Sequence, residues 1–143
     1  MIPSRHIFRL RSTDEIVKIN NLILDTHVFL WWRGNDPLLQ KNARSVISDA
    51  DIVFVSAATA WEASIKAALG RLELPETVEK GVEDSQFEKL PITFSHAETA
   101  AALPPHHYDP FDRMLVAQAI FENLTLVTHD RKLGAYDVAI LWT

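Results

Sequence analysis

Short apolar runs alternate with helical patterns along the chain, and this alternation constrains the fold more than any other feature. Most of the runs are apolar throughout, as expected for strands that are covered on both faces. Strands that alternate with helices are typical of βαβ units, so we expect an α/β fold around a mainly parallel central sheet. The expected strands are residues 21–25, 52–55, 90–93, 124–128 and 138–142.

Helix signals occupy the intervals between these strands. Asp36 and Pro37 have the pattern of an N-cap followed by proline at the first helical position. Gly70 has the position of a helix stop, and Ser95 and Glu98 have the spacing of a capping box. The expected helices are residues 37–50, 57–70, 75–89, 95–103 and 111–121.

Two of these helices differ in their apolar pattern. Helix 57–70 carries a single apolar face, which consists of Trp61, Ile65, Ala68 and Leu69. Helix 111–121 is apolar nearly all round, so it is expected to be buried. The carboxylate in its first turn should therefore face the interior or a cleft rather than bulk water.

The composition is typical of one globular domain: of 143 residues, 48% are hydrophobic and 23% are charged. Cysteine is absent, which excludes disulfides, zinc–thiolate sites and a thiol nucleophile, and which fits a reducing cytosol. The formal charge of -5 argues against non-specific binding of nucleic acid over the whole surface.

No apolar stretch reaches the roughly 18 residues that a membrane span requires. Residues 1–20 contain basic side chains but no continuous apolar core, so they do not resemble a secretory signal. We interpret residues 1–20 as an N-terminal extension and residues 21–143 as the folded domain.

Four carboxylates stand where the expected elements begin or end. Asp25 closes the first strand, Glu62 lies early in the second helix, Asp112 opens the last helix, and Asp130 follows the fourth strand. In an open α/β sheet, strand ends and the starts of the following helices face one crevice. Acids gathered there would repel one another unless a divalent cation joined them. The pattern therefore predicts a metal site.

Each acid also has a purely structural interpretation. Glu62 stands four residues before a lysine, the spacing of an exposed helix ion pair. Asp112 could be the N3 residue of a helix that Asp109 caps, and Asp25 and Asp130 could cap the turns that follow them. Taken singly, these interpretations are as good as the metal site; taken together they are weaker, because four independent caps need not lie at one sheet edge.

Carboxylates without cysteine suit hard cations, Mg²⁺ or Mn²⁺, rather than zinc or copper. Such a cation orients water, lowers its pKa and stabilises charge on a phosphodiester. The chain has no phosphate-binding glycine loop and no Gly-x-Ser-x-Gly elbow. An aspartyl-phosphate enzyme with Asp25 as nucleophile stays open but ranks low, because no second aspartate follows two residues later to act as the acid.

Four segments around these acids resemble the motifs of PIN-domain ribonucleases, and in particular of VapC toxins. They are residues 22–27 (LILDTH), 56–62 (SAATAWE), 103–113 (LPPHHYDPFDR) and 126–130 (LVTHD). Leu141 and Trp142 resemble the closing strand. Each motif alone is weak, but all four in this order are specific, and the match spans residues 21–143.

The resemblance implies a PIN-like three-layer α/β/α sandwich that acts as the toxin of a type II toxin–antitoxin system. It implies a cytoplasmic endoribonuclease that depends on Mg²⁺ or Mn²⁺ and forms a homodimer. It also implies that a VapB-like antitoxin neutralises the enzyme, and that the toxin contacts DNA only through that antitoxin. By position, the metal and catalytic residues are Asp25, Glu62, Asp112 and Asp130, and the supporting hydroxyls are those of Thr26 and Thr128.

Polar side chains beside the motifs are candidates for RNA contact, although each could equally be an ordinary solvated group. The candidates are Lys66, Arg113, His106 and His107. Trp31 and Trp32 could stack bases, but packing in the core or in a groove for an antitoxin helix is favoured. Two other functions stay open: a PIN-like protein-binding module without catalysis, and an RNA-processing nuclease outside any toxin–antitoxin pair.

Overall fold

Five parallel strands form the centre of the computed structural model, which describes residues 21–143. The strands are β1 (Asn21–Leu24), β2 (Ile52–Ser56), β3 (Glu88–Leu90), β4 (Thr125–Thr128) and β5 (Ile140–Trp142). Their order in the sheet is β3-β2-β1-β4-β5, and every neighbouring pair is parallel. The order therefore reverses between β1 and β4, where open α/β sheets place their ligand sites. The predicted extension, residues 1–20, lies outside the described residues.

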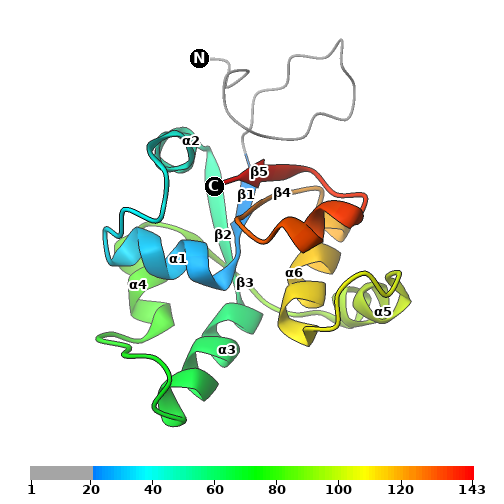
Figure 1. Ribbon diagram of the computed structural model, residues 1–143, viewed down its shortest axis with the longest axis horizontal. Coiled ribbons are helices and arrows are strands. Elements are labelled where there is room, and N and C mark those ends of the chain that lie inside the picture. Colours follow the sequence, from blue (N-terminus) through cyan, green and yellow to red (C-terminus); the bar gives the residue numbers. More distant parts are fainter. Residues whose placement is uncertain (1–20) are drawn as a thin grey trace.

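Helices cover both faces of this sheet (Figure 1). Leu22 and Leu24 of β1 face one layer, and Ile23 faces the other, because successive strand side chains alternate. The first layer holds α1 (Thr26–Arg33), α2 (Lys41–Asp49) and α4 (Val78–Asp84); the second holds α6 (Pro110–Phe121) and the 3₁₀ helix η1 (Arg131–Ala135). Helix α3 (Ala57–Ala68) follows β2 directly, and α5 (Phe94–Ala102) packs against α6. The predicted three-layer sandwich is confirmed.

Several predicted boundaries were wrong. The strand expected at 90–93 ends at Leu90, because Pro91 has no N–H for the ladder. The helix expected at 37–50 starts only at Lys41: the Asp36 carboxylate accepts a hydrogen bond of 2.9 Å from the Leu38 N–H and closes a turn instead. The helix expected at 75–89 is only the short α4.

Helix ends were predicted with mixed success. Gly70 has a φ of 71° just after α3, which confirms the predicted stop. The capping box of α5 was placed wrongly, because Thr93 and His96 form it rather than Ser95 and Glu98. Asp109 caps α6 and Pro110 is its first residue, as expected.

The apolar face of α3 does not lie in the core. Trp61 is 62% exposed and Leu69 is 60% exposed, while the helix buries Ala58, Thr59 and Glu62 instead. The core thus accepts a glutamate from α3 and leaves a tryptophan at the surface. No helix among residues 21–143 has the length and apolar character to cross a bilayer.

Candidate metal centre

Asp25 and Asp130 lie where the strand order reverses, at the carboxyl ends of β1 and β4. The Asp25 N–H continues the sheet ladder by donating to the Val127 carbonyl at 3.0 Å. The Asp25 side chain is only 4% exposed, and its Oδ1 caps α1 by accepting from the Val28 N–H at 2.8 Å. Burial raises the pKa of this carboxyl above its ordinary value, and the hydrogen bond from Thr128 partly opposes the shift.

Thr128, the last residue of β4, joins these two acids. Its hydroxyl donates a short hydrogen bond to Asp25 Oδ2 and accepts one of 3.1 Å from the Asp130 N–H. Asp130 in turn caps η1 by accepting from the Lys132 N–H at 3.1 Å. The predicted cap is therefore present, and Thr128 connects Asp130 to Asp25.

Glu62 reaches the same region from α3 and is only 5% exposed. The Thr26 hydroxyl donates to its Oε1 at 2.7 Å, and the Lys66 ammonium pairs with its Oε2 at 2.8 Å. The ion pair that was considered as the structural alternative does exist. It does not place Glu62 at the surface, however, because the carboxylate is buried and also accepts the hydrogen bond from Thr26 at the start of α1.

Asp112 is the N3 residue of α6, and its own N–H is 3.4 Å from the capping carboxylate of Asp109. Burial raises the pKa of Asp112 to about 7, and the charges of Asp109, Asp25 and Glu62 add to the rise. His107 acts in the opposite direction. The influence of Asp25 and Glu62 shows that acids from three separate motifs are close enough to interact.

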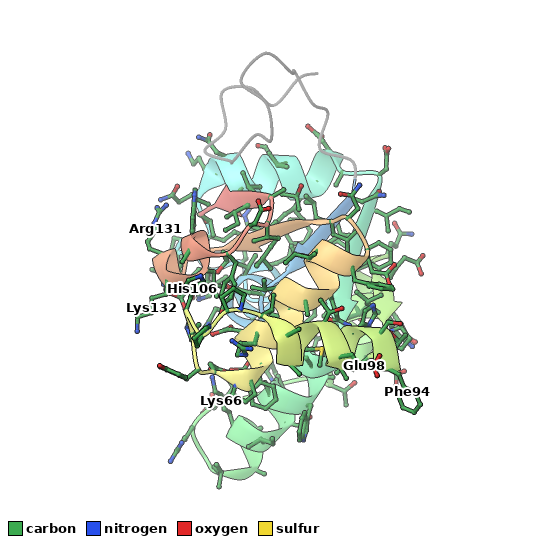
Figure 2. All side chains as sticks on the ribbon, turned by 90° about the vertical axis from the view of Figure 1, so that its right-hand side faces the viewer. Lys66, Phe94, Glu98, His106, Arg131 and Lys132 are labelled. Carbon is green, nitrogen blue, oxygen red and sulfur yellow. The ribbon has the colours of Figure 1, made fainter. Side chains whose placement is uncertain are left out.

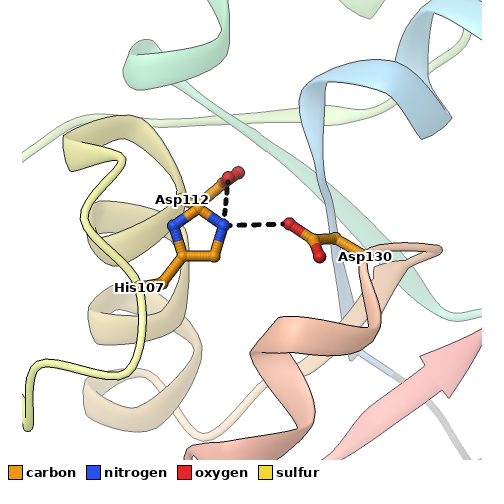
Figure 3. Close-up of side chains that lie close together, drawn as sticks. All are labelled: His107, Asp112 and Asp130. Atoms are coloured by element: carbon orange, nitrogen blue, oxygen red, sulfur yellow. Dashed lines mark hydrogen bonds and ion pairs between the residues drawn. The ribbon is translucent and has the colours of Figure 1, made fainter.

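His107 lies between two of the acids (Figure 3). Its Nε2 is 3.0 Å from Asp130 Oδ2 and 3.5 Å from Asp112 Oδ2. One ligand atom of each of these three residues falls within a common span of 4.8 Å, compact enough to surround an ion. Asp25 and Glu62 are not part of that compact group. His107 was predicted only as an RNA contact, although its position five residues before Asp112 was a usable signal of a place beside the acids.

The four predicted acids are thus linked through named neighbours rather than through direct contact. Thr26 bonds Glu62 and adjoins Asp25, Thr128 bonds Asp25 and Asp130, and His107 contacts Asp130 and Asp112. In order, this series of contacting residues is Glu62, Thr26, Asp25, Thr128, Asp130, His107 and Asp112. Both threonines therefore contact predicted acids, and their role as supporting hydroxyls stays a prediction.

The predicted RNA-contact residues differ in whether their side chains are already hydrogen-bonded within the protein. The Arg113 guanidinium donates to the carbonyls of Ala100, Leu103 and Pro104 at 2.8 to 3.0 Å. These bonds favour a role in holding the loop before α6 over a contact with RNA. His106 remains exposed, and Figure 2 shows it on the same side of the molecule as Arg131 and Lys132.

The donor set fits a hard cation. The four predicted ligands offer only carboxylate oxygens, and within the described part of the chain the Asp112 carboxylate has no polar contact shorter than the 3.5 Å to His107 Nε2. An acid that burial and neighbouring charges keep half protonated near pH 7 is one that a divalent cation would bind in place of the proton. Oxygen ligands of this kind suit Mg²⁺ or Mn²⁺.

Comparison with known proteins agrees with the sequence resemblance. Residues 22–139 match the PIN domain family. The chain is 33% identical over 121 residues to Ribonuclease VapC22 of Mycobacterium tuberculosis (strain ATCC 25618 / H37Rv), a match that covers 82% of this chain and 93% of that protein.

Solved structures share the fold at lower identity. The VapBC2 structure from Rickettsia felis, bound to a DNA fragment from their promoter, aligns with a TM-score of 0.62 and 16% identity, covering 82% of this chain and 93% of that one. VapBC-5 of Mycobacterium tuberculosis, a member of the VapBC family of toxin-antitoxin systems, aligns with a TM-score of 0.57 and 20% identity, covering 86% and 98%.

Proposed function

The chain belongs to the PIN domain family, in which it is related to the VapC ribonucleases, and from this membership we propose that it is the toxin of a type II toxin–antitoxin pair. The proposed activity is endonucleolytic cleavage of RNA phosphodiester bonds, supported by bound Mg²⁺ or Mn²⁺ and carried out in the cytoplasm. The acting unit is residues 21–143.

Family membership carries this proposal, and the state of Asp112 supports its metal dependence. Its carboxyl is 22% exposed, and its pKa of about 7 reflects burial together with the charges of Asp109, Asp25 and Glu62. A folded core gains nothing from placing Asp25, Glu62 and Asp109 near Asp112, since their charges raise the free energy of its ionised form. A divalent cation removes that repulsion, so the arrangement makes sense as a binding site.

In the proposed site Asp25, Glu62, Asp112 and Asp130 hold the cation. The bound cation supplies a low-pKa water and neutralises charge on the phosphodiester. Thr26 and Thr128 fix the directions of Glu62 and Asp25 through the hydrogen bonds described above. Lys66, which is 38% exposed beside Glu62, and the exposed His106 remain the candidates for contacts with RNA phosphates.

The proposed partners are RNA, a VapB-like antitoxin and a second copy of the chain, with DNA approached only through the antitoxin. A cavity of about 450 Å³ lies between α1 and the segment 72–78, and it is lined by Leu30, Trp31, Leu74 and Pro75 among others. Its apolar wall suits one face of an antitoxin helix. The exposed apolar face of α3 supports the homodimer.

The proposed activity is tested with Asp25→Asn and Asp112→Asn. Asparagine keeps the N-cap that Asp25 supplies to α1, so the variant tests charge rather than folding. Both variants should lose Mn²⁺-dependent RNA cleavage by at least about 100-fold, and expression should no longer arrest growth. Asp49→Asn, an exposed acid at the end of α2, is the matched control and should cleave as the unaltered chain does.

RNA 5′ ends sequenced after brief induction would identify the cleaved RNA, with Asp25→Asn as the background. Cleavage that persists in both variants, or in excess chelator, would exclude the metal-dependent reaction. Growth arrest without cleavage would instead favour the protein-binding module. An adjacent gene for a small antitoxin distinguishes a toxin from an RNA-processing nuclease.

A further inference from the structure

The imidazole of His107 has a hydrogen-bonding pattern that fixes which of its nitrogens carries the proton. The Asp109 N–H donates to Nδ1 at 3.1 Å, so Nδ1 presents its lone pair. In the neutral ring the proton is then on Nε2, the nitrogen that lies between the acids. Nε2–H donates to Asp130 Oδ2 at 3.0 Å, and Asp112 Oδ2 lies 3.5 Å from the same nitrogen.

This pattern conflicts with a role for His107 as a metal ligand. Coordination through Nε2 requires a bare nitrogen there, and in neutral imidazole the proton would have to move to Nδ1. That proton would face the Asp109 N–H, donor against donor, at the 3.1 Å now spanned by a hydrogen bond. The ring therefore suits hydrogen-bond donation to the carboxylates better than ligation of an ion.

Hydrogen bonds to the backbone of its loop also restrain His107. The His107 N–H donates to the Tyr136 hydroxyl at 3.0 Å, and Arg113 binds the Leu103 and Pro104 carbonyls at 3.0 Å each. The side chain is only 13% exposed. Tertiary contacts therefore fix the position of the His107 side chain between α6 and the segment after β4.

We propose that His107 is a positioning residue, which donates its Nε2–H to Asp130 and so holds that carboxylate beside Asp112 for a divalent cation, without ligating the ion. This inference rests on the proposed metal-dependent function of the same site. A donor between two acids offsets their repulsion and fixes their separation before the cation arrives. It also keeps the ligand set all-oxygen, which favours Mg²⁺ and Mn²⁺ over zinc.

Two substitutions separate the roles of the two ring nitrogens. The His107→Gln side chain can place an amide N–H near the position of Nε2, whereas His107→Asn reaches only as far as Nδ1. Mn²⁺ affinity of the full chain, measured by calorimetry without RNA or antitoxin, should fall about 10- to 100-fold in His107→Asn. It should stay within about threefold of the unaltered chain in His107→Gln. His107→Phe, with ring volume but no donor, should resemble His107→Asn.

His106→Gln is the matched control, because it alters the neighbouring exposed histidine and should leave Mn²⁺ affinity unchanged. The visible spectrum of bound Co²⁺ provides a second measurement and should be the same in His107→Gln and the unaltered chain. Unchanged Mn²⁺ affinity in both His107→Asn and His107→Phe would overturn the proposal. So would equal losses in His107→Gln and His107→Asn, and an altered Co²⁺ spectrum would then identify His107 as a ligand. Absence of any cation binding by the unaltered chain would overturn the proposed function as well.

Discussion

Asp112 makes the cation-free protein less stable as the pH rises. A carboxyl whose pKa is raised on folding, here from 3.8 to about 7, stabilises the folded state fully below pH 3.8 and loses that contribution as the pH rises to 7. Asp112→Asn removes the titration. In chelator, its free energy of unfolding relative to the unaltered chain should therefore increase by about 2–4 kcal/mol between pH 4 and pH 8.

Urea denaturation at a series of pH values measures this difference. Asp49→Asn carries the same charge change at an exposed position and should show no comparable trend with pH. A flat difference between Asp112→Asn and the unaltered chain would mean that Asp112 is ionised without a cation, and that the crowding of acids at the strand ends is weaker than described.

A divalent cation competes with the proton on the same acids. Burial raises the pKa of both Asp25 and Asp112, so a cation must displace more proton at pH 6 than at pH 8. One fixed Mn²⁺ concentration, about 100-fold above the Kd at pH 8, should raise Tm by roughly 8 °C at pH 8 and by clearly less at pH 6, where the Kd is higher. Thermal unfolding followed by circular dichroism tests this, and an equal shift at both pH values would contradict it.

Elements were predictable where a local pattern and the tertiary structure agree. The apolar strands β1, β2 and β4 were recognisable because burial on both sides leaves a continuous apolar run. Helix α6 was expected to be buried, but only Leu115–Ala119 are, and Phe121 is 53% exposed. Boundaries failed where a side chain had two local options: Asp36 closes a turn instead of capping a helix, and Thr93 replaces Ser95 as the cap of α5. Sequence spacing alone does not distinguish these alternatives.

The candidate site likewise contains residues that local motifs predict and residues that only tertiary contacts bring into place. The four acids were predicted because each lies within its own motif, and the structure brings Asp112 and Asp130 into one compact group with His107 but leaves Asp25 and Glu62 outside it. The bridging hydroxyl of Thr128 was expected only by resemblance, and its bond to Asp25 joins residues 103 positions apart. The place of His107 depends on Asp109, Tyr136 and a loop held by Arg113, contacts that only the folded chain brings together.

Helix α1 and the link from β4 to η1 bring three rings together at the edge of the site. Trp31 packs against His129 with centroids 5.0 Å apart, and His27 lies 6.1 Å from Trp31. His27 and His129 are exposed, and both lie close enough to Asp25 to lower its pKa. In the proposed ribonuclease these rings are candidate stacking surfaces for an unpaired RNA base, and Trp31 also lines the cavity proposed for the antitoxin helix.

Trp31→Ala should therefore weaken binding of a short single-stranded RNA by about 10-fold or more. Fluorescence anisotropy in the Asp112→Asn background measures binding without cleavage. Trp61→Ala, which removes an exposed tryptophan from α3, should leave the affinity for RNA unchanged. If Trp31→Ala instead weakened only the complex with the antitoxin, the rings would belong to that interface.

At the scale of the whole molecule, helix α3 exposes apolar side chains that a monomer would leave in contact with water. Trp61, Ile65 and Leu69 repeat at four-residue spacing and are 62%, 37% and 60% exposed. The ring of Phe111 from α6 lies 5.2 Å from that of Trp61 and extends the apolar surface beyond one helix. A contiguous surface of this kind is typical of an interface, and a second copy of the chain is the occupant proposed above.

Trp61→Asp should therefore convert the protein from a dimer to a monomer of 16.2 kDa, because a charge at the centre of an apolar interface loses its water without gaining a partner. Light scattering after size-exclusion chromatography gives the mass directly. Phe94→Asp is the matched control: this ring is 88% exposed at the start of α5 (Figure 2), outside α3, and its loss should leave the dimer intact. A dimer that survives Trp61→Asp but dissociates in Phe94→Asp would move the interface to α5. A mass of one chain in every variant would leave the α3 surface to the antitoxin.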